Sequence, residues 1–152
     1  MDNPAVAPVD PAPVVVSIAN SDISPTDQSE NIRSVLAFYE AALNQKDFDK
    51  AAKYLGSVYI QHNPGAEDGA EGFRKLVDMM KQKTRNRHST ILRAFGSGNY
   101  VILHVRVNNP DVADDRGSAI IDIFRMDAGK IVEHWDVRQE VPAQAKNANT
   151  MF

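Results

Sequence analysis

The sequence contains no cysteine, and this absence excludes several kinds of chemistry at once. A chain without thiols has no disulfide bond, no thiolate nucleophile, no iron–sulfur cluster and no cysteine-ligated zinc site. The redox compartment stays open, because a periplasmic protein can also lack cysteine. With thiols excluded and no local metal motif in the sequence, we expect a carboxylate with histidines to be the chemistry that the core offers.

Long hydrophobic segments are missing as well. The longest apolar run covers residues 14–16 and continues loosely to Ala19, whereas a membrane-spanning helix needs about 20 apolar residues. The first basic residue is Arg33, so the chain lacks the basic start of a signal peptide. We predict no contact with a membrane and a cytoplasmic location, and a periplasmic or secreted mature form stays open.

An excess of positive charge is also lacking. The 17 lysines and arginines are outnumbered by 20 aspartates and glutamates, which gives a formal net charge of -3 at pH 7. Proteins that bind nucleic acid normally present a positive field to its phosphate backbone. We therefore expect no nucleic acid among the partners.

Proline is concentrated at the start of the chain, where five of the eight prolines lie at or before Pro25. Proline removes a backbone donor and fixes φ, so residues 1–24 cannot form a helix. We predict an extended, mobile arm there. Residues 25–152 have the length and composition of one folded domain.

Apolar spacing predicts helices in the first part of this domain and strands in the second. Asp47 is placed to cap a second helix, and Asp68 with Glu71 resembles a capping box for a third. Helices gathered against an antiparallel sheet make an α+β architecture. The predicted helices span 26–44, 48–55 and 69–83, and the predicted strands span 58–62, 88–95, 100–108, 117–126 and 130–139.

Asp122 stands out because it lies in an otherwise apolar strand. Its neighbours on the same strand face are Ile120 and Phe124, so burial is expected to raise its pKa toward the range used in acid–base catalysis. The alternative is a structural aspartate that is satisfied by a neighbouring arginine, histidine or tyrosine.

Three histidines, His62, His104 and His134, lie on predicted strands or at their ends. None is spaced like a local metal-binding motif, and we predict no metal site. We expect them to line a cavity as hydrogen-bonding groups. A three-histidine site assembled from separate strands and isolated histidines bonded to the backbone are the alternatives.

Five aromatic residues are candidates to bind a ligand. Phe38, Phe124 and Trp135 offer apolar walls, and Tyr39 and Tyr59 offer hydroxyl groups to a ligand carbonyl. Trp135 could equally fill the core between the sheet and the helix. The tyrosines could equally be core residues with hydroxyls at the surface.

Four short segments together resemble the SnoaL-like polyketide cyclase family. This family belongs to the nuclear transport factor two-like superfamily, with ketosteroid isomerase and limonene epoxide hydrolase. The resemblance covers about residues 28–152 in matching order. The segments are YIQHNP at 59–64, DIFR at 122–125, GKIVEHWD at 129–136 and NTMF at 149–152.

The resemblance implies a cone-shaped fold, in which a curved antiparallel sheet wraps around a long N-terminal helix with two further helices. It also implies a homodimer packed through the outer sheet face. In the family's cyclases an aspartate on a central strand acts as general acid and base without metal or cofactor, and Asp122 matches it. His62, His104 and Trp135 fall where the family lines its cavity, and His134 joins them if a bulge turns its strand.

The predicted function is therefore a cofactor-independent enzyme, an aldol-type cyclase or an isomerase, acting on a small apolar carbonyl compound. Asp122 would take a proton from the carbon next to the carbonyl. His62, His104 or Tyr59 would hold the developing enolate oxygen, as preorganised donors do in ketosteroid isomerase.

Two other functions stay open. The same cavity could belong to a non-catalytic ligand-binding or dimeric assembly module. Epoxide hydrolysis needs two carboxylates and an arginine, which Asp122, Asp136 and Arg106 could supply, although strand alternation does not obviously bring them together.

Overall fold

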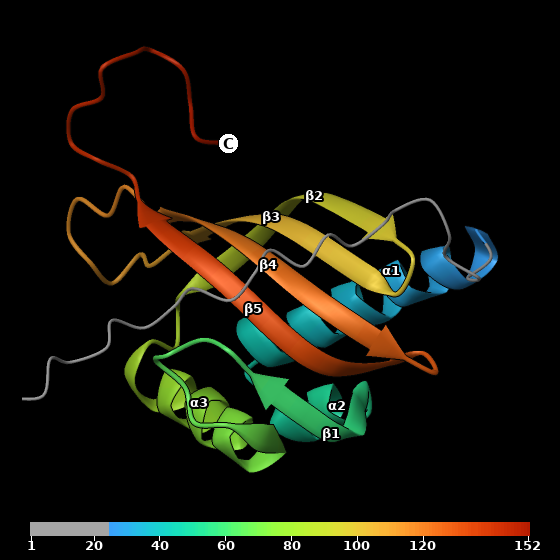
Figure 1. Cartoon of the computed structure of the whole chain (residues 1–152). Helices are drawn as coiled ribbons and strands as arrows, with labels where there is room; N and C mark the ends of the chain where they lie inside the picture. Colours follow the sequence, from blue (N-terminus) through green and yellow to red (C-terminus); the bar gives the residue numbers. More distant parts are fainter. Residues whose placement is uncertain (1–24) are drawn as a thin grey trace, which may run out of the picture.

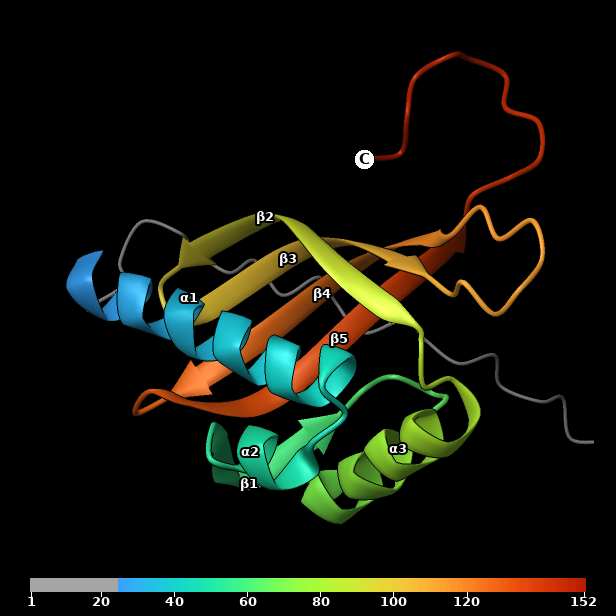
Figure 2. The same ribbon diagram turned by 180° about the vertical axis from the view of Figure 1, so that it is seen from behind.

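A long helix lies across one face of a curved five-stranded sheet in the computed structural model, which describes residues 25–152 (Figures 1 and 2). The predicted arm, residues 1–24, lies outside the described residues. Among the residues that are described, no helix is long and apolar enough to cross a membrane.

The first helix, α1, spans Pro25–Tyr39 and continues as one wider π-helical turn, η1, over Glu40–Asn44. Its apolar stripe, which includes Val35 and Phe38, is buried against the sheet. The predicted helix 26–44 is therefore confirmed, with a change of pitch after Tyr39. Such π turns occur frequently at functional sites.

Two shorter helices follow. Helix α2 (Phe48–Ala52) is capped as predicted by Asp47, whose side chain accepts a hydrogen bond from the Lys50 backbone N–H. It ends earlier than expected, because Leu55 already begins strand β1 (Leu55–Gln61) and lies beside Ile131 in the sheet. Helix α3 spans Gly69–Lys83.

The sheet has the order β1-β5-β4-β3-β2. The last four strands form the predicted antiparallel meander, whereas β1 pairs parallel with β5, so the sheet is mixed. The residue pattern predicted a strand at residues 58–62, but it did not indicate which strand of the sheet this segment would pair with. The meander strands are β2 (His88–Ser97), β3 (Tyr100–Asn108), β4 (Ser118–Asp127) and β5 (Lys130–Glu140).

One irregularity in the meander decides which side chains face the helices. Arg125 pairs with Glu133, whereas the next residue, Met126, pairs with Ile131, so Val132 is an extra residue on β5. A bulge of this kind shifts the strand alternation by one residue. Ile131 and His134 therefore both face inward, although simple alternation would place them on opposite faces.

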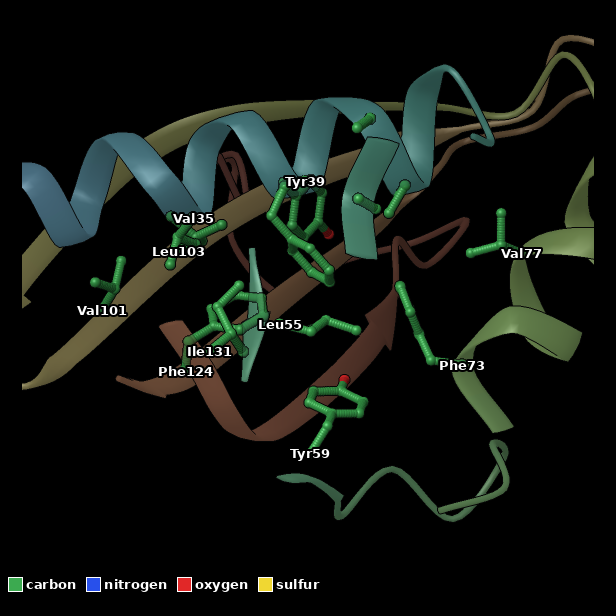
Figure 3. Close-up of a cluster of buried hydrophobic side chains, with 14 of the residues drawn as sticks. Val35, Tyr39, Leu55, Tyr59, Phe73, Val77, Val101, Leu103, Phe124 and Ile131 are labelled. Atoms are coloured by element: carbon green, nitrogen blue, oxygen red, sulfur yellow. The ribbon is translucent and has the colours of Figure 1, made fainter. Parts of the chain in front are cut away.

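The core lies between the inner sheet face and the helices (Figure 3). The predicted inner face of β3 is confirmed, since its four apolar residues are buried. The same core also contains buried aromatic side chains from three other elements. These are Tyr39 of α1, Tyr59 of β1 and Phe73 of α3. The buried residues of β3 are Val101, Leu103, Val105 and Val107.

Candidate active site

A cavity of about 560 Å³ opens between the inner sheet face and the helices. Apolar side chains from α1 and α3 form one wall, and polar side chains of β4, β5 and β1 form the other. Ligand sites commonly combine apolar walls with a few convergent polar groups in this way. The polar and charged lining residues are Tyr39, Tyr59, Gln61, Asn63, Arg87, Asp122, His134, Asp136 and Arg138.

Asp122 lies in the wall of this cavity and is only 3% exposed. The Tyr39 hydroxyl donates a hydrogen bond to its Oδ2 over 3.0 Å, and Nε2 of His134 lies 2.9 Å from its Oδ1. Burial raises the pKa of the Asp122 carboxyl and the nearby charge of Asp136 adds to this, although the hydrogen bonds from His134 and Tyr39 and the charge of His134 partly oppose it. No arginine bonds to it among residues 25–152.

Gln61 determines where His134 carries its protons. The backbone N–H of Asn63 can only donate, and it donates to Oε1 of Gln61 over 3.0 Å. The same oxygen lies 2.8 Å from Nδ1 of His134, so Nδ1 must be the donor there. His134 therefore has a proton on Nδ1, whatever the state of its other nitrogen.

One proton then lies between Asp122 and His134. With Nδ1 protonated, Nε2 either accepts a proton from a neutral Asp122 or donates one to the carboxylate. Two protonation states of equal total charge are therefore compatible with the 2.9 Å contact. A pair of this kind can take up or release a proton without changing the rest of the site.

Tyr59 supplies a hydroxyl next to this pair. Its oxygen accepts a hydrogen bond from Nε2 of Gln61 over 3.0 Å, and among residues 25–152 its own proton has no acceptor. Burial is the main cause that raises the pKa of Tyr59, so the group stays protonated. It can donate to a ligand oxygen in the cavity.

Three of the polar groups also have the composition of a cation site. Asp122, His134 and Asp136 each offer one ligand atom, and these atoms lie within 4.8 Å of one another. Carboxylate oxygens and imidazole nitrogen are ligands that divalent metals accept. The prediction of no metal site stays a prediction, and a chelator tests it below.

Comparison with known families now identifies the domain. Residues 35–134, about two thirds of the chain, match the family model described as a SnoaL-like domain. The chain belongs to the SnoaL-like domain family. A search of curated proteins finds no match.

Solved structures confirm the nuclear transport factor two-like fold of this SnoaL-like protein. A proposed polyketide cyclase from Bacillus cereus is 20% identical, with 78% of this chain and 80% of that chain covered and a TM-score of 0.65. An NTF2-like protein of unknown function from Cytophaga hutchinsonii is 22% identical, with 72% and 89% covered and a TM-score of 0.58. An LEH-like epoxide hydrolase from M. tuberculosis is 22% identical, with 74% and 85% covered and a TM-score of 0.60.

The structure brings six of the nine candidate residues of this SnoaL-like domain to the cavity. The bulge after Ile131 turns His134 inward beside Asp122. The six are Phe38, Tyr39, Tyr59, Asp122, Phe124 and His134.

The other three candidates require correction, because strand alternation places them on the outer face of the sheet. His62 bonds to Glu133 over 2.9 Å and stacks on Trp135 with ring centres 4.6 Å apart. Nδ1 of His104 lies 2.9 Å from Arg93. None of His62, His104 and Trp135 lines the cavity.

Arg106 also points away from the cavity, since its guanidinium lies over the ring of Phe152, 4.8 Å from the ring centre. Asp136 does line the cavity, directly opposite Asp122 in the sheet. The two carboxylates of the epoxide-hydrolase alternative are therefore close together, but the arginine proposed for it is on the other face.

Sequence reasoning missed four polar lining residues, Gln61, Asn63, Arg87 and Arg138. The sequence contained a signal that could have identified Gln61 as a lining residue, because Gln61 lies two residues after Tyr59 on a strand and so shares its face. Arg87 precedes a strand in a polar loop and looks like an ordinary solvated side chain.

Proposed function

We propose that this SnoaL-like protein is an enzyme that moves a proton at the carbon next to a carbonyl group, with Asp122 as the general base. The observation that carries the proposal is the buried Asp122–His134 pair, with one proton between them, in the wall of an open cavity. An aldol-type cyclase or an isomerase acting on a small carbonyl compound fits this arrangement, with no cofactor.

The chemical step begins from the carboxylate–imidazolium form. Asp122 takes the proton from the carbon, and the electron pair of the broken C–H bond forms the C=C bond of an enolate. The former carbonyl oxygen then carries the negative charge, and the Tyr59 hydroxyl is placed to stabilise it.

The second step returns the proton. In an isomerase Asp122 delivers it to another carbon of the enolate. In a cyclase the enolate carbon attacks a second carbonyl, and the resulting alkoxide takes the proton. Either way Asp122 returns to its starting form, so no oxidant, reductant or co-reactant is consumed.

The alternative of a non-catalytic module predicts a cavity filled by side chains, or Asp122 fixed by an arginine. The open cavity and the histidine partner of Asp122 support the enzyme instead. The cyclase and hydrolase names among structures of similar fold, such as those from Bacillus cereus and M. tuberculosis, are compatible with it.

Crystals soaked with a panel of aromatic and terpenoid carbonyl compounds test the location of the site. We expect density for a ligand with its carbonyl oxygen beside Tyr59 and its neighbouring carbon beside Asp122. Density only on the outer sheet face, or none for the whole panel, would contradict the proposed site.

We also propose that the protein is a homodimer formed through the outer face of the sheet. Phe95 and Ile121 are 55% and 42% exposed there, and Val137, which pairs with Ile121 and also borders the cavity, is 73% exposed. Exposed apolar patches on a folded domain commonly mark an interface.

A further inference from the structure

An arginine enters the cavity from the loop between α3 and β2. Arg87 is half-buried, lines the cavity, and lies within electrostatic reach of the Tyr39 hydroxyl, which bonds to Asp122. Among residues 25–152, no carboxylate forms an ion pair with it. A charge in such a position costs desolvation energy that no partner in the described part of the chain repays.

Other charges around Arg87 do not neutralise it. Arg138 of β5 also lines the cavity and adds a second positive charge, but it is itself paired with Glu140 over 2.8 Å. Burial lowers the pKa of Arg87, and repulsion by Arg138 lowers it further, while Glu140 and Asp115 act in the other direction without contacting it. The guanidinium nevertheless stays charged at all ordinary pH values.

The backbone of Arg87 is fixed rather than loose. The buried ammonium of Lys46 donates to the Arg87 carbonyl over 2.8 Å and to the carbonyls of Leu43 and Asn44 over 3.1 and 3.3 Å. These bonds tie the loop to the end of η1. An unpaired cation on a fixed loop is preorganised to bind an anion.

We propose that Arg87 binds a carboxylate group of the ligand, so that the substrate is a carboxylic acid with an apolar body and a carbonyl group. The planar guanidinium fork fits a carboxylate with two hydrogen bonds. The position of the substrate's carbonyl group at Asp122 rests on the proposed function. The carboxylate site at Arg87 does not depend on it.

A single negative charge fits better than two. The Asp122–His134 pair shares one proton and carries no net charge, Arg138 is paired with Glu140, and Asp136 accepts a hydrogen bond from Asn63. Of the charged lining residues, Arg87 alone has neither an ion pair nor a side-chain hydrogen bond within residues 25–152, so the cavity offers one unpaired positive charge to a ligand. A phosphate monoester would bring a second negative charge, for which the described lining residues hold no further unpaired cation.

Binding of matched ligand pairs tests this inference. Isothermal titration calorimetry would compare 2-naphthoate with 2-naphthamide, together with other aromatic and terpenoid carboxylates and their primary amides. We expect the wild-type protein to bind carboxylates about 10- to 100-fold more tightly than the amides, as for a hydrogen-bonded charge pair. Arg87→Gln should remove most of this preference, and Arg87→Lys should keep part of it.

Arg85→Gln is the matched control, because Arg85 is exposed on the same loop and does not line the cavity. Its carboxylate preference should equal that of the wild type. 1-Naphthyl phosphate should bind more weakly than 2-naphthoate. Equal binding of acids and amides by the wild type, binding of neither, tighter binding of the phosphate, or an unchanged preference in Arg87→Gln would overturn the carboxylate assignment.

The binding test separates this inference from the proposed catalysis. Asp122→Asn should keep the carboxylate preference even though it loses turnover. If the preference is present and Asp122 proves irrelevant to proton transfer, only the proposed function fails. If Asp122 governs proton transfer and the preference is absent, only the carboxylate assignment fails.

Discussion

At the scale of single residues, the position of one proton decides the chemistry of the cavity. The Asn63 backbone N–H fixes the orientation of the Gln61 amide, which fixes the proton on Nδ1 of His134. His134 then presents Nε2 to Asp122. The base and its partner are thus set by a residue that does not touch the reacting atoms.

Replacing Gln61 with methionine should release His134 from its single tautomer, because the acceptor for Nδ1–H is lost. Long-range ¹H–¹⁵N NMR correlations of the His134 ring would report this. We expect Nδ1 to be protonated in the wild type and a mixture of tautomers in Gln61→Met. A wild-type ring with an unprotonated Nδ1 would contradict the assignment.

The pH dependence of catalysis should reflect the raised pKa of Asp122. A general base works only when deprotonated, so kcat/KM should fall as pH drops through a value above the ordinary 3.8 of an aspartate. Tyr39→Phe removes a hydrogen bond that favours the carboxylate, so the fall should move to higher pH. A fall at or below 3.8, or a shift to lower pH in the variant, would refute this role.

At the scale of elements, the helices and strands were predictable because apolar periodicity is a local property of the sequence. The face of β5 that meets the cavity was harder to predict. The extra Val132 moves His134 inward and leaves Trp135 outward, and such a bulge depends on pairing with β4. Asp68 likewise matched a helix cap, but its side chain accepts a hydrogen bond from the backbone of Gln61 instead.

The corner between η1 and α2 should depend on Lys46. Lys46→Met would leave three backbone carbonyls without their charged donor, and we expect a loss of about 2 kcal/mol or more in the free energy of unfolding. Urea denaturation would measure it. Lys50→Met, at an exposed position of α2, is the control and should change stability by less than about 0.5 kcal/mol. Equal stability of both variants would show that Lys46 does not hold this corner.

At the scale of the whole molecule, the two sheet faces have separate tasks. The inner face carries the polar cavity, and the outer face carries the stacked His62–Trp135 pair and exposed apolar side chains. The order of helices and strands and the apolar setting of Asp122 could be predicted, because both depend on patterns within single elements, whereas the cone-shaped fold was implied by the family resemblance. His62 and His104 were assigned to the cavity by the family resemblance, whereas alternation with the inward-facing Gln61 and Leu103 places both on the outer face.

A charge on the outer face should disrupt the proposed dimer. Val137→Lys places an ammonium at the most exposed apolar site, and size-exclusion chromatography with light scattering should then give the mass of one chain, 16.8 kDa. The wild type should have twice that mass. Asp127→Lys, at the exposed end of β4, is the control. A monomeric wild type, or a dimer that survives Val137→Lys, would contradict the proposed interface.

The most direct test of Asp122 as a base is hydrogen–deuterium exchange at carbon. The protein would be incubated in D₂O with the carbonyl compounds that it binds, with and without EDTA, and loss of the α-proton signal would be followed by NMR. We expect the wild type to accelerate the exchange, Asp122→Asn to reduce the acceleration by about 10²-fold or more, and His104→Gln to match the wild type. Equal acceleration by the wild type and Asp122→Asn, or its loss on adding EDTA, would contradict metal-free proton transfer by Asp122.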